Sequence, residues 1–272
     1  MPEGDTIFRA ARSLHRALAG RTVTAFESVF PALARIDEDQ PIAGRIVEAV
    51  SSRGKHLLMA FSGGLTLHTH MRMNGSWHLY RAGERWQRPR RDMRVVVGTD
   101  AFVAVGFNVP VAEFLTAREL ERHESLRRLG PDVAAAADAD EMLRRMRQHD
   151  RDPIADVLLN QRVLAGIGNV LKSETLFVAG IHPFAQTGTL GDEALHRLLQ
   201  TAVDLIAMNT KPRTTADARA FGRRTTNSLD PDRKLWVYGR AGQPCLRCGT
   251  PIEMRKTGLE ARTTFWCPRC QS

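Results

Sequence analysis

Four cysteines near the end of the chain constrain its fold more than any other feature of the sequence. They form two Cys-x-x-Cys pairs, Cys245 with Cys248 and Cys267 with Cys270, separated by 18 residues. This spacing is typical of a structural zinc site, because two intervening residues let one turn present both thiolates to a tetrahedral ion. We therefore predict one structural zinc ion and no organic cofactor, with residues 250–266 forming a β-hairpin that carries the second pair.

The position of the cysteines also bears on the redox compartment. All four lie within the last 28 residues, so a disulfide framework spread over the fold is disfavoured. Two local disulfides or free thiols are the alternative to zinc. The start of the chain lacks a secretory signal pattern, and no run of 18 apolar residues occurs. We therefore expect a cytoplasmic, nucleoid-associated protein that does not span a membrane.

The charge of the chain favours a polyanionic partner. Lys and Arg number 39 against 30 Asp and Glu, which gives a net charge of +9. Nucleic acid is the leading candidate, and a solvated basic surface is the alternative. With 272 residues and 43% hydrophobic residues, the chain is globular and long enough to bury a core.

Hydrophobic periodicity predicts a helix and then a β-rich region in the first part of the chain. Apolar residues fall at helical spacing at Ile7, Ala11, Leu14 and Leu18. They predict a helix with Asp5 as its N-cap and Gly20 after its last turn. The pattern then changes to short strands, including 55–61, 65–70, 94–97 and 102–105, which predict a β-sandwich or barrel. The polar, basic segment 81–91 predicts an exposed loop.

Helical periodicity returns after residue 115. The expected helices cover 116–122, 140–148, 152–164, 169–179 and 192–208, with Asp152 and Pro153 beginning the third and Gly180 ending the fourth. Residues 210–233 lack periodicity and predict a mobile connector. The fold class is therefore α+β, with four segments: an N-terminal helix and β-sandwich (1–115), a helical domain (116–209), the connector (210–233) and a zinc β-hairpin (234–272).

The second residue is a candidate nucleophile. Removal of Met1 would leave Pro2 with a free secondary amine, and an α-amino group with a pKa of about 7.7–8.0 is about one-tenth neutral at pH 7. Such an amine attacks carbonyl-like carbon and yields an iminium ion, while Glu3 beside it can transfer a proton. The alternative is structural, because Pro and Glu are common in the first turn of any helix.

Four motifs in order resemble the formamidopyrimidine-DNA glycosylase and endonuclease VIII family over essentially the whole chain. They are PEG at 2–4, SRGKHLL at 52–58, LAGIGN at 164–169 and RTTFWCPRCQ at 262–271. The resemblance implies a β-sandwich, a helix-two-turn-helix domain and a zinc β-hairpin. It also implies a monomeric enzyme that acts on damaged DNA in base excision repair, as both a DNA glycosylase and an AP lyase.

The same resemblance implies a role for each candidate site residue. Pro2 attacks C1′ of a damaged nucleoside and forms a Schiff base, and Glu3 is the acid/base. Lys55 contacts the phosphate at the lesion and assists β-elimination, Asn169 contacts phosphate, and Arg262 contacts phosphate and takes part in δ-elimination. If the side chains of Lys55, Asn169 and Arg262 and one further cation contact phosphates, the logarithm of the DNA-binding constant should fall with the logarithm of the salt concentration with a slope of about −3.6.

The segment 70–75, HMRMNG, resembles the void-filling loop of the family. An everted nucleotide leaves a gap in the base stack, and an apolar side chain can fill it. Met73 is the candidate wedge, with Arg72 or Asn74 beside it. A core methionine at a strand end is the competing interpretation.

Two features predict the branch of the family. Gly4-Asp5 after Glu3 resembles endonuclease VIII, and VGFNV at 105–109 lacks the Arg-Arg-Phe-Gly tract of the formamidopyrimidine branch. We therefore predict that oxidised pyrimidines are the substrates. Met73 and VYGR at 237–240 resemble the formamidopyrimidine branch, so specificity for 8-oxoguanine or formamidopyrimidine stays open. A catalytically silent zinc-containing DNA-binding protein is the alternative outside the enzyme class.

Overall fold

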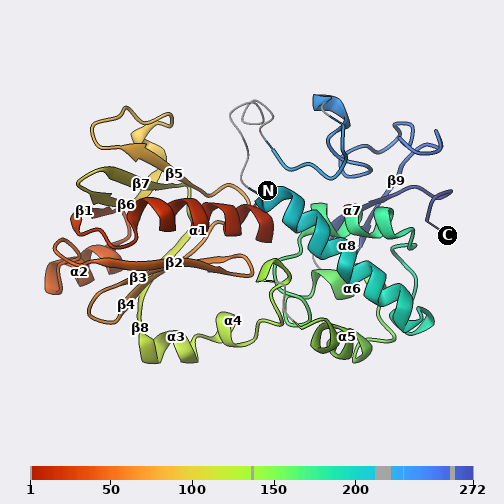
Figure 1. Ribbon diagram of the computed structural model, residues 1–272, viewed down its shortest axis with the longest axis horizontal. Coiled ribbons are helices and arrows are strands. Elements are labelled where there is room, and N and C mark those ends of the chain that lie inside the picture. The colour runs from red at the N-terminus through yellow and green to blue at the C-terminus, as the bar shows by residue number, and fades with distance from the viewer. Residues whose placement is uncertain (1, 136–137, 212–221, 229, 258–260, 272) are drawn as a thin grey trace. The chain divides into compact units, whose positions relative to one another are not determined.

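The computed structural model describes residues 2–135, 138–211, 222–228, 230–257 and 261–271 (Figure 1). Its chain divides into two units, Met1–Arg128 and Leu129–Ser272. Met1 and part of the predicted connector, residues 212–221 and 229, lie outside the described residues. Within the described part of the chain, no helix has the length and apolar character needed to cross a membrane.

Helix α1, Gly4–Leu18, begins the first unit and buries one apolar face. That face includes Ile7, Ala11, Leu14, Ala17 and Leu18, which confirms the predicted pattern. The predicted N-cap is wrong, because the backbone turns helical earlier. Glu3 is the N-cap, and its carbonyl accepts the first helical hydrogen bonds, while Asp5 lies in the first turn. Gly20 follows the helix at φ +78°, a left-handed conformation that favours glycine.

Two antiparallel four-stranded sheets form the predicted β-sandwich (Figure 1). The first has the order β1, β6, β7, β5, with bounds Val23–Ser28, Met93–Thr99, Phe102–Phe107 and Ser76–Arg81. The second has the order β2, β3, β4, β8, with bounds Val47–Arg53, His56–Phe61, Leu65–His70 and Val111–Thr116. Short helices complete the unit: α2 (Pro31–Asp39), α3 (Ala117–Arg122), α4 (Glu124–Arg127) and a 3-10 turn at Arg90–Asp92.

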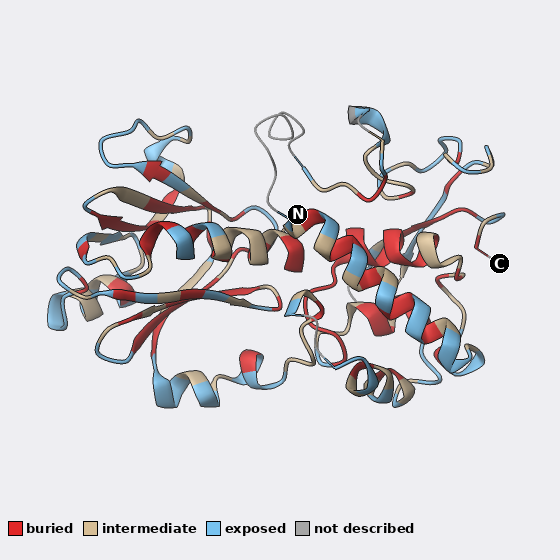
Figure 2. Cartoon of the chain, viewed as in Figure 1, coloured by how far each residue is buried: buried red, intermediate tan, exposed pale blue. Residues whose placement is uncertain are grey.

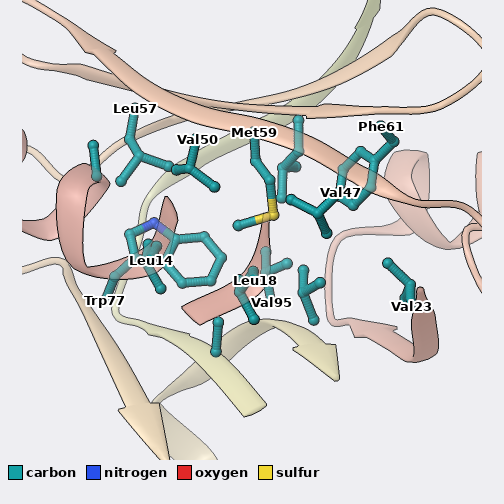
Figure 3. Packing of buried hydrophobic residues seen from close by; sticks show 14 of the residues in the cluster. Leu14, Leu18, Val23, Val47, Val50, Leu57, Met59, Phe61, Trp77 and Val95 are labelled. Carbon is teal, nitrogen blue, oxygen red and sulfur yellow. The ribbon is translucent and has the colours of Figure 1, made fainter. Parts of the chain in front are cut away.

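The core of the first unit lies between its sheets. Helix α1 contacts β2, β3 and β7, and therefore strands of both sheets. Figure 3 shows Leu18 of α1 packed with Met59 of β3 and Val95 of β6, all of them fully buried. Burial of each such side chain stabilises the fold by about 1.5–3 kcal/mol, so this apolar cluster holds the sandwich together.

The second unit begins with helices. They are α5 (Ala139–Arg147), α6 (Ile154–Leu159), α7 (Asn169–Ala179) and α8 (Asp192–Thr210), with 3-10 turns at Val133–Ala135, Thr187–Thr189 and Pro231–Arg233. The predicted helix over 152–164 is too long, and Pro153 rather than Asp152 is its N-cap. Carbonyls of residues 183–185 accept the first amide hydrogens of α6, so no side-chain cap is needed. Gly180 ends α7 at φ +73°, as predicted.

An antiparallel hairpin carries the second cysteine pair. Its strands are β9, Glu253–Thr257, and β10, Arg262–Trp266. The hairpin lies within the predicted range 250–266, and β10 packs against α7. Figure 2 shows that α7 is buried along most of its length, which makes it the central helix of this unit.

Candidate functional site

The amino terminus is held at the start of α1. Pro2 is half-buried, whereas Glu3 is fully buried. The Glu3 carbonyl accepts hydrogen bonds from the amides of Thr6 at 2.9 Å and Ile7 at 3.0 Å. Since α1 packs into the sandwich core, both candidate catalytic residues stand on a rigid element, as a catalytic site requires.

Strand β2 runs back along α1 in the opposite direction. The amide of Gly20, just past the helix, donates to the carbonyl of Val47 at 2.8 Å. Further along, the amide of Val50 donates to Nδ1 of His15 at 3.1 Å. The end of β2 therefore approaches the beginning of α1.

This antiparallel arrangement brings Lys55 to the same end of the unit as Pro2. From His15 back to Pro2 the helix extends about 20 Å, at about 1.5 Å per residue. From Val50 forward to Lys55 the strand extends about 17 Å, at about 3.3 Å per residue. Lys55 lies half-buried in the turn between β2 and β3. Figure 1 shows this turn at the end of the unit where α1 begins.

The segment 71–75 extends from the same end of the sheet, because His70 of β4 pairs with His56 beside Lys55. The Arg72 amide donates to Nδ1 of His70 at 3.1 Å, and Arg72 adopts φ +45°. Gly75 closes the turn on Met71, where a Cβ atom would lie 2.6 Å from the Met71 carbonyl oxygen.

The two methionines of this turn have opposite environments. Met73 is 58% exposed, whereas Met71 is 2% exposed and belongs to the core. The core interpretation therefore applies to Met71. Met73 is available to contact another molecule, and its role as a wedge stays a prediction.

Two uncharged histidines, His56 and His70, pair across the sheet beside Lys55. Burial, with a smaller effect from neighbouring positive groups, lowers the pKa of His56 to about 3 and that of His70 to about 4. Lys55 and Arg72 are among the groups that lower the pKa of His70. At pH 7 both imidazoles are uncharged, so the positive charge at this end of the unit comes from the lysine and arginine side chains.

In the second unit, Gln161 holds the turn between α6 and α7. Its Nε2 donates to the carbonyls of Leu159 at 2.7 Å and Ile167 at 2.9 Å, and its Oε1 accepts from the amide of Gly166 at 3.1 Å. Gly166 has φ +102°, which favours glycine at this position. The turn delivers Asn169 to the first position of α7, where amide groups at a helix start can face an anion.

Lys172 connects Asn169 to the zinc hairpin, a link that the sequence pattern did not reveal. This lysine is fully buried, and its Nζ donates to Oγ1 of Thr264 at 2.7 Å and to the carbonyl of Thr263 at 3.3 Å. It also donates to Oδ1 of Asn169 at 3.3 Å. Because exposed Arg262 immediately precedes Thr263 on β10, this contact brings the elements of the two predicted phosphate ligands together.

Glu174 fixes the approach to the first cysteine pair and was also missed from the sequence. This buried carboxylate accepts hydrogen bonds from the amides of Trp236 at 2.7 Å, Val237 at 2.9 Å and Tyr238 at 2.8 Å. The hydroxyl of Thr225 donates to it as well. Burial raises the pKa of Glu174, while these four hydrogen bonds act in the opposite direction. The carboxylate therefore clamps residues 236–238 to α7.

The four cysteines form a zinc-binding cluster. All are free thiols, and their sulfurs lie within 4.8 Å of one another. Two of the separations are 4.0 Å, from Cys245 to Cys270, and 3.4 Å, from Cys248 to Cys267. A tetrahedral ion with Zn–S bonds of about 2.3 Å places its sulfurs about 3.8 Å apart, so the cluster fits zinc and excludes the disulfide alternative. When bound, the ion would organise the hairpin without an open coordination position for chemistry.

Comparison with known proteins matches three successive regions of the chain. Residues 1–122 match the formamidopyrimidine-DNA glycosylase N-terminal domain, and residues 129–217 match the H2TH domain of that enzyme. Residues 242–272 match the zinc finger found in FPG and IleRS. These matches confirm the predicted fold class and the zinc site.

Full-length relatives include endonucleases 8. The chain is 42% identical over 276 residues to the probable endonuclease 8 2 of Streptomyces coelicolor, covering all of this chain and 94% of that protein. It is 38% identical to the DNA-(apurinic or apyrimidinic site) lyase Nei2 of Mycolicibacterium smegmatis, covering 100% of this chain and 99% of the lyase. An endonuclease 8 of Escherichia coli is 33% identical over the whole of both chains.

Solved structures have the same fold. The Lactococcus lactis Fpg in complex with DNA containing an abasic site matches with a TM-score of 0.80 at 22% identity, over 99% of each chain. The predicted resemblance is thereby confirmed over the full length. The chain belongs to the formamidopyrimidine-DNA glycosylase family, in its endonuclease VIII branch.

Proposed function

We propose that the chain is a bifunctional DNA glycosylase and AP lyase of base excision repair that removes oxidised pyrimidines through a Schiff base on Pro2. The observation that carries this proposal is the placement of Pro2 and Glu3 at the rigid start of α1, at the same end of the unit as Lys55. Family membership and relatives named endonuclease 8 and AP lyase support the enzyme class.

The proposed reaction begins with attack of the neutral Pro2 amine on C1′ of the damaged nucleoside. The N-glycosidic bond breaks, and the base leaves with the bonding electron pair and takes up the proton that the Pro2 nitrogen loses. Glu3 donates a proton to the sugar ring oxygen, the ring opens, and an iminium ion forms between Pro2 and C1′. Loss of a proton from C2′ then expels the 3′ phosphate, whose negative charge Lys55 stabilises. A second elimination, assisted by Arg262, releases the 5′ phosphate.

The second unit supplies phosphate contacts in this proposal. Lys172 donates to the side-chain carbonyl of Asn169, which leaves the amide NH₂ group of Asn169 to donate to a phosphate oxygen. The first amide groups of α7 add donors at the positive end of the helix dipole. Arg262, exposed at the start of β10, supplies a full positive charge.

The preference for oxidised pyrimidines rests on the branch of the family. The relatives named endonuclease 8 support it, as does the tract VGFNV at 105–109 in place of Arg-Arg-Phe-Gly. In the void left by the everted nucleotide, we propose Met73 as the wedge, with Arg72 beside it. We also propose that the protein acts as a monomer on the nucleoid in the cytoplasm, where its DNA substrate lies.

Trapping with borohydride tests the proposed nucleophile. Protein whose intact mass shows loss of Met1 should form a covalent adduct with an oligonucleotide that holds one abasic site, and protein that retains Met1 should not. A panel of damaged bases should then give faster excision of thymine glycol than of 8-oxoguanine. Binding without any adduct from protein that begins at Pro2 would identify a silent DNA-binding protein.

Substitution of Glu3 tests the acid/base role separately. Glu3→Gln should slow excision of a damaged base by about 10²–10⁴-fold, the usual contribution of a positioned general acid. Glu121→Gln is the matched control, because that exposed glutamate lies on α3 and should leave excision unchanged. Equal excision rates for Glu3→Gln and the wild type would remove Glu3 from the mechanism.

A further inference from the structure

A second cluster of metal-binding side chains lies within the first unit. His68 on β4 pairs across the sheet with Glu113 on β8, and His123 lies at the junction of α3 and α4. The Oε1 atom of Glu113 lies 2.8 Å from Nδ1 of His68 and 3.0 Å from Nε2 of His123. The three ligand atoms lie within 4.8 Å of one another, although the residues come from three different elements.

The opposite side of each imidazole also has a hydrogen-bond partner. Nε2 of His68 lies 2.7 Å from Nδ1 of His56, and Nδ1 of His123 lies 3.1 Å from Oγ of Ser125. Metal-binding histidines characteristically donate their other N–H group to such a partner, which fixes the ring and its tautomer. In this cluster Nδ1 of His68 and Nε2 of His123, which face Glu113, can each present a lone pair to a metal ion. The other nitrogen of each ring then carries the hydrogen.

We propose that His68, Glu113 and His123 bind one divalent transition-metal ion of the zinc type, in addition to the ion of the four cysteines. Two imidazoles and one carboxylate suit zinc, whereas calcium and magnesium prefer an all-oxygen set. Bonds of about 2.0–2.1 Å in a tetrahedral site place ligand atoms about 3.3 Å apart. The present separations of 2.8 and 3.0 Å need to widen by only a few tenths of an ångström.

Graded exposure gives the ion a route from solvent. The side chain of His68 is 2% exposed, that of His123 is 20% exposed and that of Glu113 is 40% exposed. An ion held by the three would rest on a buried ligand and keep its remaining coordination positions toward water. Because His123 joins α3 to α4, the ion would also tie this junction to the sheet.

The alternative is a hydrogen-bonded cluster without a metal, in which the carboxylate accepts from both imidazoles. The metal-bound and metal-free clusters differ in the number of zinc ions that each chain binds. Untagged protein loaded with zinc at the four cysteines, then titrated with Zn²⁺ in a calorimeter, should bind a second equivalent. Metal analysis after dialysis should give two ions per chain. A single equivalent would overturn the proposal.

Three variants locate the second ion. His123→Gln and the isosteric Glu113→Gln should each weaken its binding by at least about 100-fold, because loss of a partner outside the ligand set already costs about 10–100-fold. Ser125→Ala should weaken it by about 10-fold. His149→Gln is the matched control, since His149 lies 2.8 Å from Asp152 as a single imidazole–carboxylate pair.

Cobalt distinguishes the two sites by their ligands. Co²⁺ added to the zinc-loaded protein should give visible bands without the near-ultraviolet sulfur-to-metal absorption that thiolate ligands cause. His123→Gln should lose these bands and keep one zinc ion. A second equivalent that binds equally well to His123→Gln and Glu113→Gln would be an ion bound elsewhere on the surface, and the proposal would fail.

Discussion

The β-sandwich and the zinc hairpin are each stabilised by different interactions. The sandwich encloses a continuous apolar core between two sheets and α1, in which Met59 and Phe61 are fully buried. In the hairpin, β9 is exposed along nearly its whole length. Its small cluster consists of Phe177, Val237, Cys245, Ile252, Phe265 and Cys267, so two of the six residues are metal ligands.

This contrast shows what each region requires of its sequence. Short strands rich in apolar residues and one amphipathic helix are sufficient to indicate the sandwich, because these elements together supply its core. A module as small as the hairpin cannot bury enough apolar surface by itself and needs a metal or an anchor. Here α7 is the anchor, through Lys172 and Glu174.

Removal of the zinc ion at the four cysteines should have the largest effect and should act on the hairpin alone. Apparent zinc binding of about 10–16 kcal/mol is coupled to folding in modules of this size. Cys267→Ser, which removes a ligand of the four-cysteine ion alone, should therefore abolish amide protection in β9 and β10, as followed by hydrogen exchange with mass spectrometry. Strands β3 and β4 should keep their protection. Parallel loss of protection in both regions would show that the sandwich also depends on the metal.

A cavity in the sandwich core should have the next largest effect. Phe61→Ala removes a fully buried ring that contacts Phe114, with ring centroids 6.2 Å apart, and should cost about 3–5 kcal/mol. Urea unfolding measures the change. Met254→Ala on β9 is the contrasting control, because this side chain is 46% exposed and its loss should change stability by less than about 0.5 kcal/mol.

Loss of the Glu174 clamp should have an intermediate effect. Glu174→Gln removes the charge that accepts three backbone hydrogen bonds and should cost about 1.5–3 kcal/mol. Exchange of the amides at residues 236–238 should rise even with zinc bound. Glu193→Gln is the control, since this exposed carboxylate pairs with Arg197 on the surface of α8. Unchanged exchange at 236–238 would mean that the zinc alone positions this segment.

The same contrast separates what the sequence predicted from what it did not. Features with local signals were predicted: the cysteine pairs, strand 65–70, and helix 169–179 with Gly180 at its end. The sequence favours Asp5 as the N-cap of α1, because a short acidic side chain is a common cap, whereas the helix begins at Glu3 with no side-chain cap. A local pattern thus predicts an element better than its first residue.

Contacts between distant segments left no local signal. Lys172 and Thr264 are separated by 92 residues, and Glu174 and Trp236 by 62. The sequence signal for these contacts is limited to the positions of Lys172 and Glu174 among the apolar residues of α7. Lysine and glutamate are more often exposed, so this signal does not predict buried contacts. The catalytic and DNA-binding roles of Pro2, Glu3 and Lys55 rest on the family resemblance and stay predictions for the trapping experiments.

Removal of the N-terminal cap of α3 should have the smallest effect on the free energy of unfolding. This helix lies outside the apolar core of the first unit. Helix α3 has no buried residue, and a reciprocal capping box between Thr116 and Glu119 begins it. Thr116→Ala should cost about 1 kcal/mol, because an amide at the helix start loses its acceptor. Thr201→Ala is the matched control, since its hydroxyl bonds to the carbonyl of Arg197 within α8 and caps nothing. Urea unfolding compares the two variants, and an equal loss in both would show that α3 is held by contacts other than its cap.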